Sequence, residues 1–293
     1  MDRTTAHRAA VRSRRGRAHR RVAALLAILA CAVCGSTPAA ADPPAAELRL
    51  TVEPDTLPIA TGQCNAGQLL VRLTNRGPAP VYADAVLTAS DALHLPRRLI
   101  STWLPAGYTR TVPVTVGAPT GTPAGTYAVR VASGDQQANV QVTVASPRPS
   151  INLTRSAARV SASSSRAGYL VCGAVDGDAD PTHWGHGTGW ADATGRQWPD
   201  WYQLNWDTPQ QLSRVDIATA NSAEFPTERY GLRDWDVQVA TADGWRTVVE
   251  VRGNTAATVS STFPTQRTDT LRIVAYAANG ANDQSRIVEL TVF

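Results

Sequence analysis

Short runs of alternating apolar and polar residues recur along most of the chain after residue 46. In the first half these runs are separated by turn-forming Gly, Pro, Asn and Asp residues. The expected strands there are 48–52, 69–73, 81–88, 109–116, 127–131 and 138–144. A period of two residues, with turns at this spacing, predicts a β-sandwich of immunoglobulin type with about seven strands.

The same alternation returns after the segment 146–150, which contains two prolines. Prolines keep a chain extended, so this segment is expected to link a first domain, 46–145, to a second, 151–293. The expected strands of the second domain are 201–206, 213–219, 234–240, 245–251, 258–263, 270–275 and 285–292. This pattern predicts another antiparallel sandwich, of jelly-roll type. The fold class is therefore all-β, with two β-sandwiches.

Residues 1–41 have a different composition. Eight arginines precede an apolar run from Val22 to Val33, and Ala39-Ala40-Ala41 follows it. This order is typical of a secretory signal peptide, and we expect a secreted, extracellular protein. The apolar run is shorter than the roughly 20 residues that span a bilayer, so we expect no transmembrane segment. The segment Ile28–Cys31 loosely resembles a lipobox, which leaves lipid attachment as an alternative.

Charge and cysteine content narrow the partners and the compartment. Without residues 1–41 the formal net charge changes from +4 to about −3, which gives no electrostatic footprint for nucleic acid. We expect no nucleic-acid partner, and we expect a monomer. Cys64 and Cys172 remain, one in each predicted domain. They either form a disulfide or stay as two buried thiols, and an oxidising compartment favours the disulfide.

The segment Gly173–Trp206 concentrates the candidate chemistry. It opens with an acidic turn, 176–181, in which three aspartates alternate with Gly, Ala and a final Pro. Close carboxylates on a turn suit a hard cation such as Ca²⁺. A part rich in Gly, Trp and His follows, which is typical of a loop, and alternation at 200–206 then predicts a strand.

Several motifs in the second domain stand in the order and spacing of a known family. They are Ala174-Val175-Asp176-Gly177, Trp201-Tyr202-Gln203-Leu204-Asn205, Trp235-Asp236-Val237-Gln238-Val239 and Ile287-Val288-Glu289-Leu290-Thr291-Val292. The chain from Asn152 to Phe293 resembles a discoidin, or coagulation-factor type C, domain. That galactose-binding-like fold includes carbohydrate-binding modules of secreted bacterial glycosidases. In the first domain, Leu73–Gly77 and Pro123–Tyr127 resemble a NEW3-like immunoglobulin-type domain.

The discoidin resemblance implies one structural calcium ion. Its ligands, carried over by position, are Asp176, Asp178, Thr182 and Glu289. The resemblance also implies carbohydrate binding by loops at one end of the sandwich, where an aromatic ring covers a sugar and polar groups bond its hydroxyls. The candidates are His186, Trp190, Trp198, Arg229 and Asn282. The strand tryptophans are expected to pack inside the sandwich, and these are Trp201, Trp206, Trp235 and Trp245.

These features predict a secreted, non-catalytic protein that binds an extracellular polysaccharide or a cell-surface glycan. The chain has no Gly-x-Ser-x-Gly elbow, and the pair His183 and His186 lacks the helix and the acid of a zinc motif, so we do not expect an enzyme. Two alternatives stay open. The first is an adhesion or scaffolding module that binds a protein or a lipid headgroup. The second is the accessory tail of a glycoside hydrolase.

Overall fold

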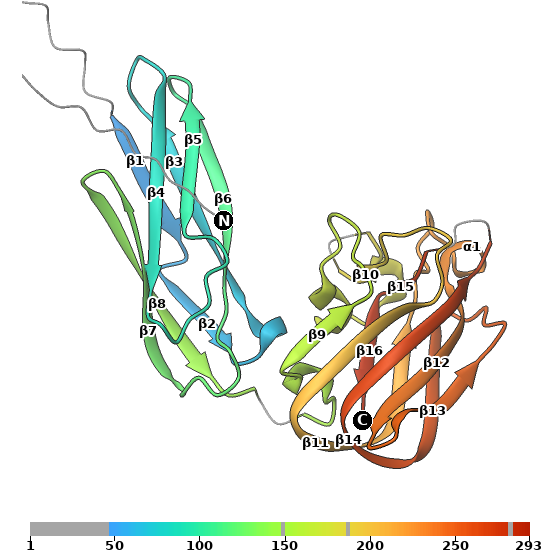
Figure 1. The fold of residues 1–293 in the computed structure, drawn as a ribbon. Helices are drawn as coiled ribbons and strands as arrows, with labels where there is room; N and C mark the ends of the chain where they lie inside the picture. The colour runs from blue at the N-terminus through green and yellow to red at the C-terminus, as the bar shows by residue number, and fades with distance from the viewer. Residues whose placement is uncertain (1–46, 148–149, 186–187, 281–283) are drawn as a thin grey trace, which may run out of the picture. The chain divides into compact units, whose positions relative to one another are not determined.

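The computed structural model describes residues 47–147, 150–185, 188–280 and 284–293 (Figure 1). The predicted signal peptide lies outside these ranges, so the structure leaves it untested. The described residues consist mainly of strands. Within the described ranges no helix has the length and apolarity that a membrane span requires.

In the described residues up to 147, the chain forms a sandwich of a three-stranded and a five-stranded sheet. The strand orders are β1-β3-β6 and β2-β8-β7-β4-β5. The bounds are β1 Leu48–Glu53, β2 Thr56–Ala60, β3 Gly67–Asn75, β4 Val81–Ala89, β5 Leu99–Leu104, β6 Thr109–Val116, β7 Gly125–Ser133 and β8 Gln136–Ala145. Alternate residues face inward, as on β4, where Ala83, Ala85 and Leu87 are buried.

The sequence analysis did not predict two strands of this sandwich, β2 and β5. β2 contains Pro58, which has no N–H group to donate to a ladder and is therefore unusual in a strand. It lies at the edge of its sheet, where proline is tolerated, and pairs in parallel with β8. β5 is the opposite edge, and its outward residues include the apolar Leu99 and Trp103, which obscure the alternation.

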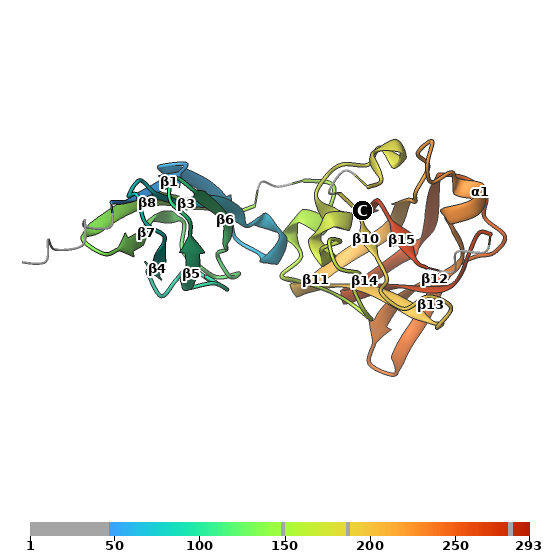
Figure 2. The ribbon, with the colours of Figure 1, turned by 90° about the horizontal axis from the view of Figure 1, so that it is seen from above.

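The second sandwich contains a six-stranded sheet with the order β13-β12-β14-β11-β16, in which β9 also pairs with β11. The pair β10 and β15 lies beside it (Figures 1 and 2). The strand bounds are β9 Arg159–Ala162, β10 Trp190–Ala191, β11 Asp200–Ala218, β12 Leu232–Thr241, β13 Gly244–Val251, β14 Thr258–Ala278, β15 Arg286–Ile287 and β16 Glu289–Val292. β11 joins two predicted strands, 201–206 and 213–219, through register shifts at 205–214.

Short helical turns complete the chain. The only α-helical turn in the described ranges is α1, Thr227–Tyr230, between β11 and β12. The 3₁₀ turns are η1 Gln63–Asn65, η2 Thr154–Ser156, η3 Val171–Val175 and η4 Pro181–His183.

Each sandwich has its own hydrophobic cluster. In the second, Tyr202, Leu204 and Trp206 are buried on one face of β11, which confirms a strand at 200–206. Trp201 lies on the opposite face and is only half-buried, so the prediction that it packs inside is wrong. Trp235 is also buried. The prediction that Trp245 packs inside is wrong, because β13 is an edge strand and leaves this side chain 41% exposed. The guanidinium of Arg272 covers its ring at 3.8 Å.

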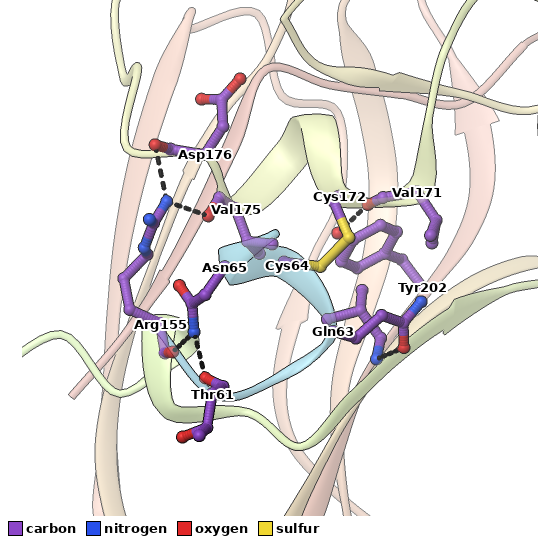
Figure 3. Close-up of a disulfide and its surroundings, with 11 residues drawn as sticks. Thr61, Gln63, Cys64, Asn65, Arg155, Val171, Cys172, Val175, Asp176 and Tyr202 are labelled. Carbon is purple, nitrogen blue, oxygen red and sulfur yellow. Dashed lines mark hydrogen bonds between the residues drawn. A yellow bond between two sulfur atoms is a disulfide. The ribbon is translucent and has the colours of Figure 1, made fainter. Parts of the chain in front are cut away.

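A disulfide joins Cys64 on η1 to Cys172 on η3, with 5.2 Å between the Cα atoms (Figure 3). The structure thus contains the disulfide that the sequence analysis favoured over two buried thiols. Hydrogen bonds flank it on both sides. Gln63 Oε1 accepts from the amide of Val160 at 3.0 Å, and Asn65 Nδ2 donates to the carbonyl of Arg155 at 2.9 Å. The η1 turn of the first sandwich is therefore bonded to Arg155, Val160 and Cys172 of the second.

Candidate functional site

Several loops of the second sandwich meet at one end of it, as expected from the sequence. The amide of Asp192 donates to the carbonyl of Ser285 at 3.0 Å, and the amide of Asn221 donates to Pro181 at 2.9 Å. The amide of Asn279 donates to Gly231 at 2.8 Å. We call the surface that these loops form the loop end. Its described residues are 163–185, 188–199, 219–231, 279–280 and 284–288.

The acidic turn contacts a buried carboxylate. Glu289 begins β16 and is 2% exposed. Its Oε2 accepts from the amide of Gly177 at 3.3 Å, whereas its Oε1 is buried without a hydrogen-bond partner. Burial raises the pKa of Glu289 to about 7, and the charge of Asp176 adds to the rise, while the Gly177 amide and Arg155 oppose it.

Asp176 lies beside Glu289 and holds the turn together. Its Oδ1 accepts from the amide of Asp178 at 2.9 Å, and its Oδ2 accepts from the hydroxyl of Thr188 at 2.8 Å. The turn requires a positive φ of 98° at Gly177, which glycine adopts without strain. Arg155 Nη1 donates to the carbonyls of Val175 and Asp176 at 3.2 and 2.8 Å (Figure 3). The carboxylates of Asp176 and Glu289 and the hydroxyl of Thr188 thus lie together at the acidic turn.

The structure brings Asp176 and Glu289 together, but it turns the side chains of the other two predicted ligands elsewhere. The Asp178 carboxylate bonds to His183 Nδ1 at 2.8 Å, which raises the pKa of that histidine. The Thr182 hydroxyl donates to Asp180 at 2.7 Å. Thr188 is the threonine beside Asp176. The sequence did not reveal it, because a glycine-rich stretch of unusual length separates it from the acidic turn.

Asp176, Thr188 and Glu289 fit a calcium ion chemically. Calcium takes six to eight oxygen ligands, including hydroxyls, carbonyls and water. The unpaired Oε1 of Glu289 is an atom that a cation would satisfy. Among the described residues no group of three or more His, Cys, Asp or Glu side chains could hold a metal. Backbone carbonyls and water would therefore have to supply the remaining ligands.

The candidate sugar-binding residues differ in their exposure. Trp190 is 1% exposed, because its place on β10 turns the ring inward against Tyr202, and its Nε1 donates to Ser164 at 2.9 Å. It is a core residue, and the prediction of a surface platform there is wrong. Trp198 is half-buried against the hydrophobic cluster, and Arg229 is exposed on α1. His186 and Asn282 lie outside the described residues.

Other aromatic side chains occupy the loop end instead. Tyr169 stacks on the buried Trp184, with 4.9 Å between ring centroids and 15° between the planes. Phe225 and Tyr230 meet edge to face at 5.1 Å. Tyr169, Phe225 and Tyr230 are half-buried. No sequence signal distinguished them, because none of them belongs to a periodic pattern of apolar and polar residues.

One guanidinium group, that of Arg286, lies beside these rings, and a second, that of Arg166, is linked to it through Gln284. Arg286 is 2% exposed and lies 5.4 Å from the centroid of Tyr230. Gln284 Oε1 accepts from Arg286 Nη2 at 3.0 Å and from the exposed Arg166 at 3.3 Å. Burial lowers the pKa of Arg286 to about 10, and the like charge of Arg166 adds to the effect. Gln284 thus orients Arg166 at the surface.

A buried acid pair lies beneath the loop end. Asp192 and Asp200 are 0% and 2% exposed. The Ser164 hydroxyl donates to Asp192, and the Ser285 hydroxyl donates to Asp200 at 2.8 Å. Burial raises the pKa of Asp200 to about 7; the Ser285 hydroxyl opposes the rise, and the charge of Asp192 adds to it. These bonds tie three loops to one another.

No family model matches this chain, and no curated protein does. Solved structures are similar to about half of it. The chitosan-binding module 2 of a Paenibacillus sp. IK-5 chitosanase/glucanase, in complex with chitotriose, is 24% identical, with 48% of this chain and 99% of that chain covered and a TM-score of 0.39.

Two further neighbours are of the same kind. The lectin domain of lectinolysin, complexed with Lewis B antigen, is 19% identical over 48% of this chain and 95% of its own, with a TM-score of 0.40. The family 32 carbohydrate-binding module of Streptococcus pneumoniae EndoD is 18% identical over 46% and 94%, with a TM-score of 0.37. These structural neighbours are carbohydrate-binding modules and lectin domains.

Proposed function

We propose that this chain is a secreted, non-catalytic carbohydrate-binding protein whose second sandwich binds glycan at the loop end. The observation that carries the proposal is the grouping of half-buried rings with an oriented arginine. Tyr169 and Tyr230 offer aromatic surface, and Arg166 bonds to Gln284, which also holds the Arg286 beside Tyr230. A sugar needs both partners, because its C–H face packs on a ring and its hydroxyls bond to planar polar groups.

Calcium is part of this proposal as a structural ion. Asp176, Thr188 and Glu289 would hold it with backbone carbonyls and water. The ion would neutralise the two carboxylates and brace the turn from which the first loop departs. It would take no part in a chemical reaction.

The position of the buried acid pair supports a non-catalytic role. Asp192 and Asp200 resemble the paired carboxylates of a glycosidase in type, but they are 0% and 2% exposed. A substrate cannot reach them beneath the loops that they tie together. Their role in the proposed protein is to hold the loop end in shape.

One observation favours a second candidate function, adhesion to a protein or to a lipid headgroup. Leu170 is 76% exposed at the loop end, next to Tyr169. An apolar side chain at a loop tip suits insertion into a lipid or protein surface better than contact with a sugar. Leu170→Ser would then abolish binding to phosphatidylserine vesicles while it leaves glycan binding unchanged.

A glycan array with the full secreted chain, in calcium and in chelator, tests the main proposal. Selective binding is expected, and Arg166→Ala should weaken it about tenfold by removing charge-assisted hydrogen bonds. Arg246→Ala is the matched control, because Arg246 is exposed on β13, away from the loop end. A blank array from the folded, calcium-loaded chain, or equal affinity of Arg166→Ala and wild type, would contradict the proposal.

A further inference from the structure

The first sandwich carries large apolar side chains on the outside of β4 and β5. Tyr82 is 78% exposed and Trp103 is 52% exposed, while Val86 and Leu99 are 50% and 58% exposed. Single exposed apolar side chains are ordinary on a protein surface, but a contiguous group usually marks a binding surface. These four side chains belong to two paired strands, so the register of β4 and β5 shows whether they form a contiguous group.

The register of the two strands defines this surface. Tyr82 pairs with Trp103, Asp84 with Ser101 and Val86 with Leu99. Between them, Ala83, Ala85 and Ile100 are buried and Thr102 is half-buried, so the six paired side chains lie together on the outward face. Paired residues lie about 5 Å apart, and successive pairs on a face lie about 6.7 Å apart along the strands. We call this surface the β4–β5 face. An aromatic pair, a polar pair and an aliphatic pair follow one another along it.

The β4–β5 face is open to an elongated ligand. β5 is the edge strand of its sheet, so no strand beyond it covers Trp103. On the other side, the outward residues of β7 opposite Val86 and Thr88 are Ala132 and Arg130. Beyond β4 the large apolar side chains therefore give way to the small Ala132 and the charged Arg130.

We propose that the β4–β5 face is a second carbohydrate site, which takes an uncharged glycan chain. Tyr82 and Trp103 offer two adjacent rings to the C–H faces of sugar units. Asp84 and Ser101 accept hydrogen bonds from hydroxyl groups. The carboxylate of Asp84 disfavours an anionic sugar, because like charges repel at this distance.

The position of Asp84 selects a sugar over a protein partner. Asp84 is exposed at the centre of the face, and no ion pair within the described ranges includes it. A protein that covered the face would have to desolvate this charge and supply a basic partner for it, and interface centres are depleted of charged groups. A second copy bound about a twofold axis would oppose two Asp84 carboxylates. A hydroxyl donates to the carboxylate and leaves it partly in water.

This site does not depend on the proposed loop-end function. The two surfaces lie on different sandwiches, which are joined by the Cys64–Cys172 disulfide. A polymer that reached both would bind with higher avidity than either site alone. A short oligosaccharide would not show that gain.

Affinity electrophoresis of the full chain in soluble polysaccharides tests the β4–β5 face. The probes are barley β-glucan, xyloglucan, galactomannan and, as an anionic comparison, polygalacturonic acid. We expect retardation by at least one uncharged polymer, weakened about tenfold or more in Y82A/W103A. Tyr108→Ala is the matched control, because Tyr108 is also 52% exposed but lies in the turn between β5 and β6. It should behave as wild type.

A conservative variant covers the case in which Y82A/W103A does not fold. Asp84→Asn keeps the size of the side chain and removes its charge, and it should weaken retardation several-fold. Circular dichroism confirms the fold of each variant. Light scattering provides an independent test. A wild-type dimer that Y82A/W103A dissociates would overturn the proposal in favour of self-association.

Arg166→Ala in the same gels separates this site from the loop end. Loss of retardation in Arg166→Ala alone, with Y82A/W103A unchanged, would overturn the β4–β5 site and support the loop end. Loss in Y82A/W103A alone would support the β4–β5 site and count against the loop end. Absence of retardation by every uncharged polymer would overturn the β4–β5 site.

Discussion

Glu289 is the side chain on which the acidic turn depends. Its Oε1 is buried and has no hydrogen-bond partner, and Asp176 adds a second negative charge nearby. Leaving a buried polar group unpaired costs about 1–3 kcal/mol, and more when the group is charged. A bound cation would remove that cost, so calcium and folding should be coupled at this residue.

Calcium should therefore raise the thermal midpoint of the wild-type chain, and Glu289→Gln should abolish the increase. Calcium at about 100 times its Kd would stabilise the folded state by about 2.7 kcal/mol. Thr188→Val and Thr182→Val form a matched pair, because Thr188 bonds to Asp176 whereas Thr182 bonds to Asp180. Calorimetry should show that the first variant loses most of the response and the second keeps it. Equal responses would contradict the assigned site.

The buried Asp200 predicts a dependence of stability on pH. Its pKa is raised from the usual 3.8 to about 7, so the folded state favours the protonated form. The stability contributed by this group is complete below about pH 4 and is lost as the pH rises through 7. Asp200→Asn keeps an acceptor for Ser285 but does not titrate. Relative to wild type, the variant should gain on the order of a few kcal/mol between pH 5 and pH 8.

Urea unfolding at the two pH values measures this difference in the free energy of unfolding. Titrating groups that do not contact Asp200, including Glu289, contribute equally to both proteins and cancel. Asp91→Asn is the control, because Asp91 is exposed in the first sandwich and should show no such difference. Parallel pH profiles for wild type and Asp200→Asn would contradict the burial of an ionisable Asp200.

At the scale of elements, strand pairing decides which aromatic residues are accessible. β10 has only two residues, yet its pairing with β15 places Trp190 in the core. β13 is longer, but its edge position leaves Trp245 partly exposed. Exposure of a tryptophan thus follows from the neighbours of its strand rather than from the composition of its loop.

Trp190→Ala should therefore act on stability before it acts on binding. Removal of a fully buried tryptophan costs about 3–5 kcal/mol. Trp245→Ala removes a partly exposed ring and should cost clearly less. Chemical unfolding of both variants tests the order. A stable Trp190→Ala variant that loses only ligand binding would restore the surface platform that the structure excludes.

The alternation of side chains made most of the fold predictable from the sequence. It predicted the strand that contains Tyr202, Leu204 and Trp206, because period-two alternation is local. It missed β5, because two of the outward residues of that strand, Leu99 and Trp103, are apolar. The site was less predictable, because Thr188 and Arg166 reach their partners through long-range contacts across loops. Sequence spacing carries no record of such contacts.

At the scale of the whole molecule, the Cys64–Cys172 bridge closes a loop of the chain between the two sandwiches. The two cysteines are 108 residues apart in sequence. In the chain-entropy model, a loop of this length stabilises the folded state by about 4–5 kcal/mol. The bridge also lies close to the acidic turn, since Cys172 and Val175 share η3.

Replacing both cysteines with serine should lower the free energy of unfolding by up to that amount. Urea unfolding of the double variant, beside wild type with and without reductant, measures the loss. Reduced wild type should approach the double variant, which controls for the serine side chains. Unfolding curves that coincide for oxidised and reduced protein would contradict a stabilising role.

Hydrogen–deuterium exchange with a bound glycan tests whether the loop end holds the sugar. The full chain, saturated with calcium and with a glycan selected on the array, is compared with the glycan-free chain. Peptides that cover 163–175, 219–231 and 284–288 should exchange more slowly in the complex, because the loop end is proposed to hold the sugar. Saturating glycan that leaves the exchange of all these peptides unchanged would contradict the account.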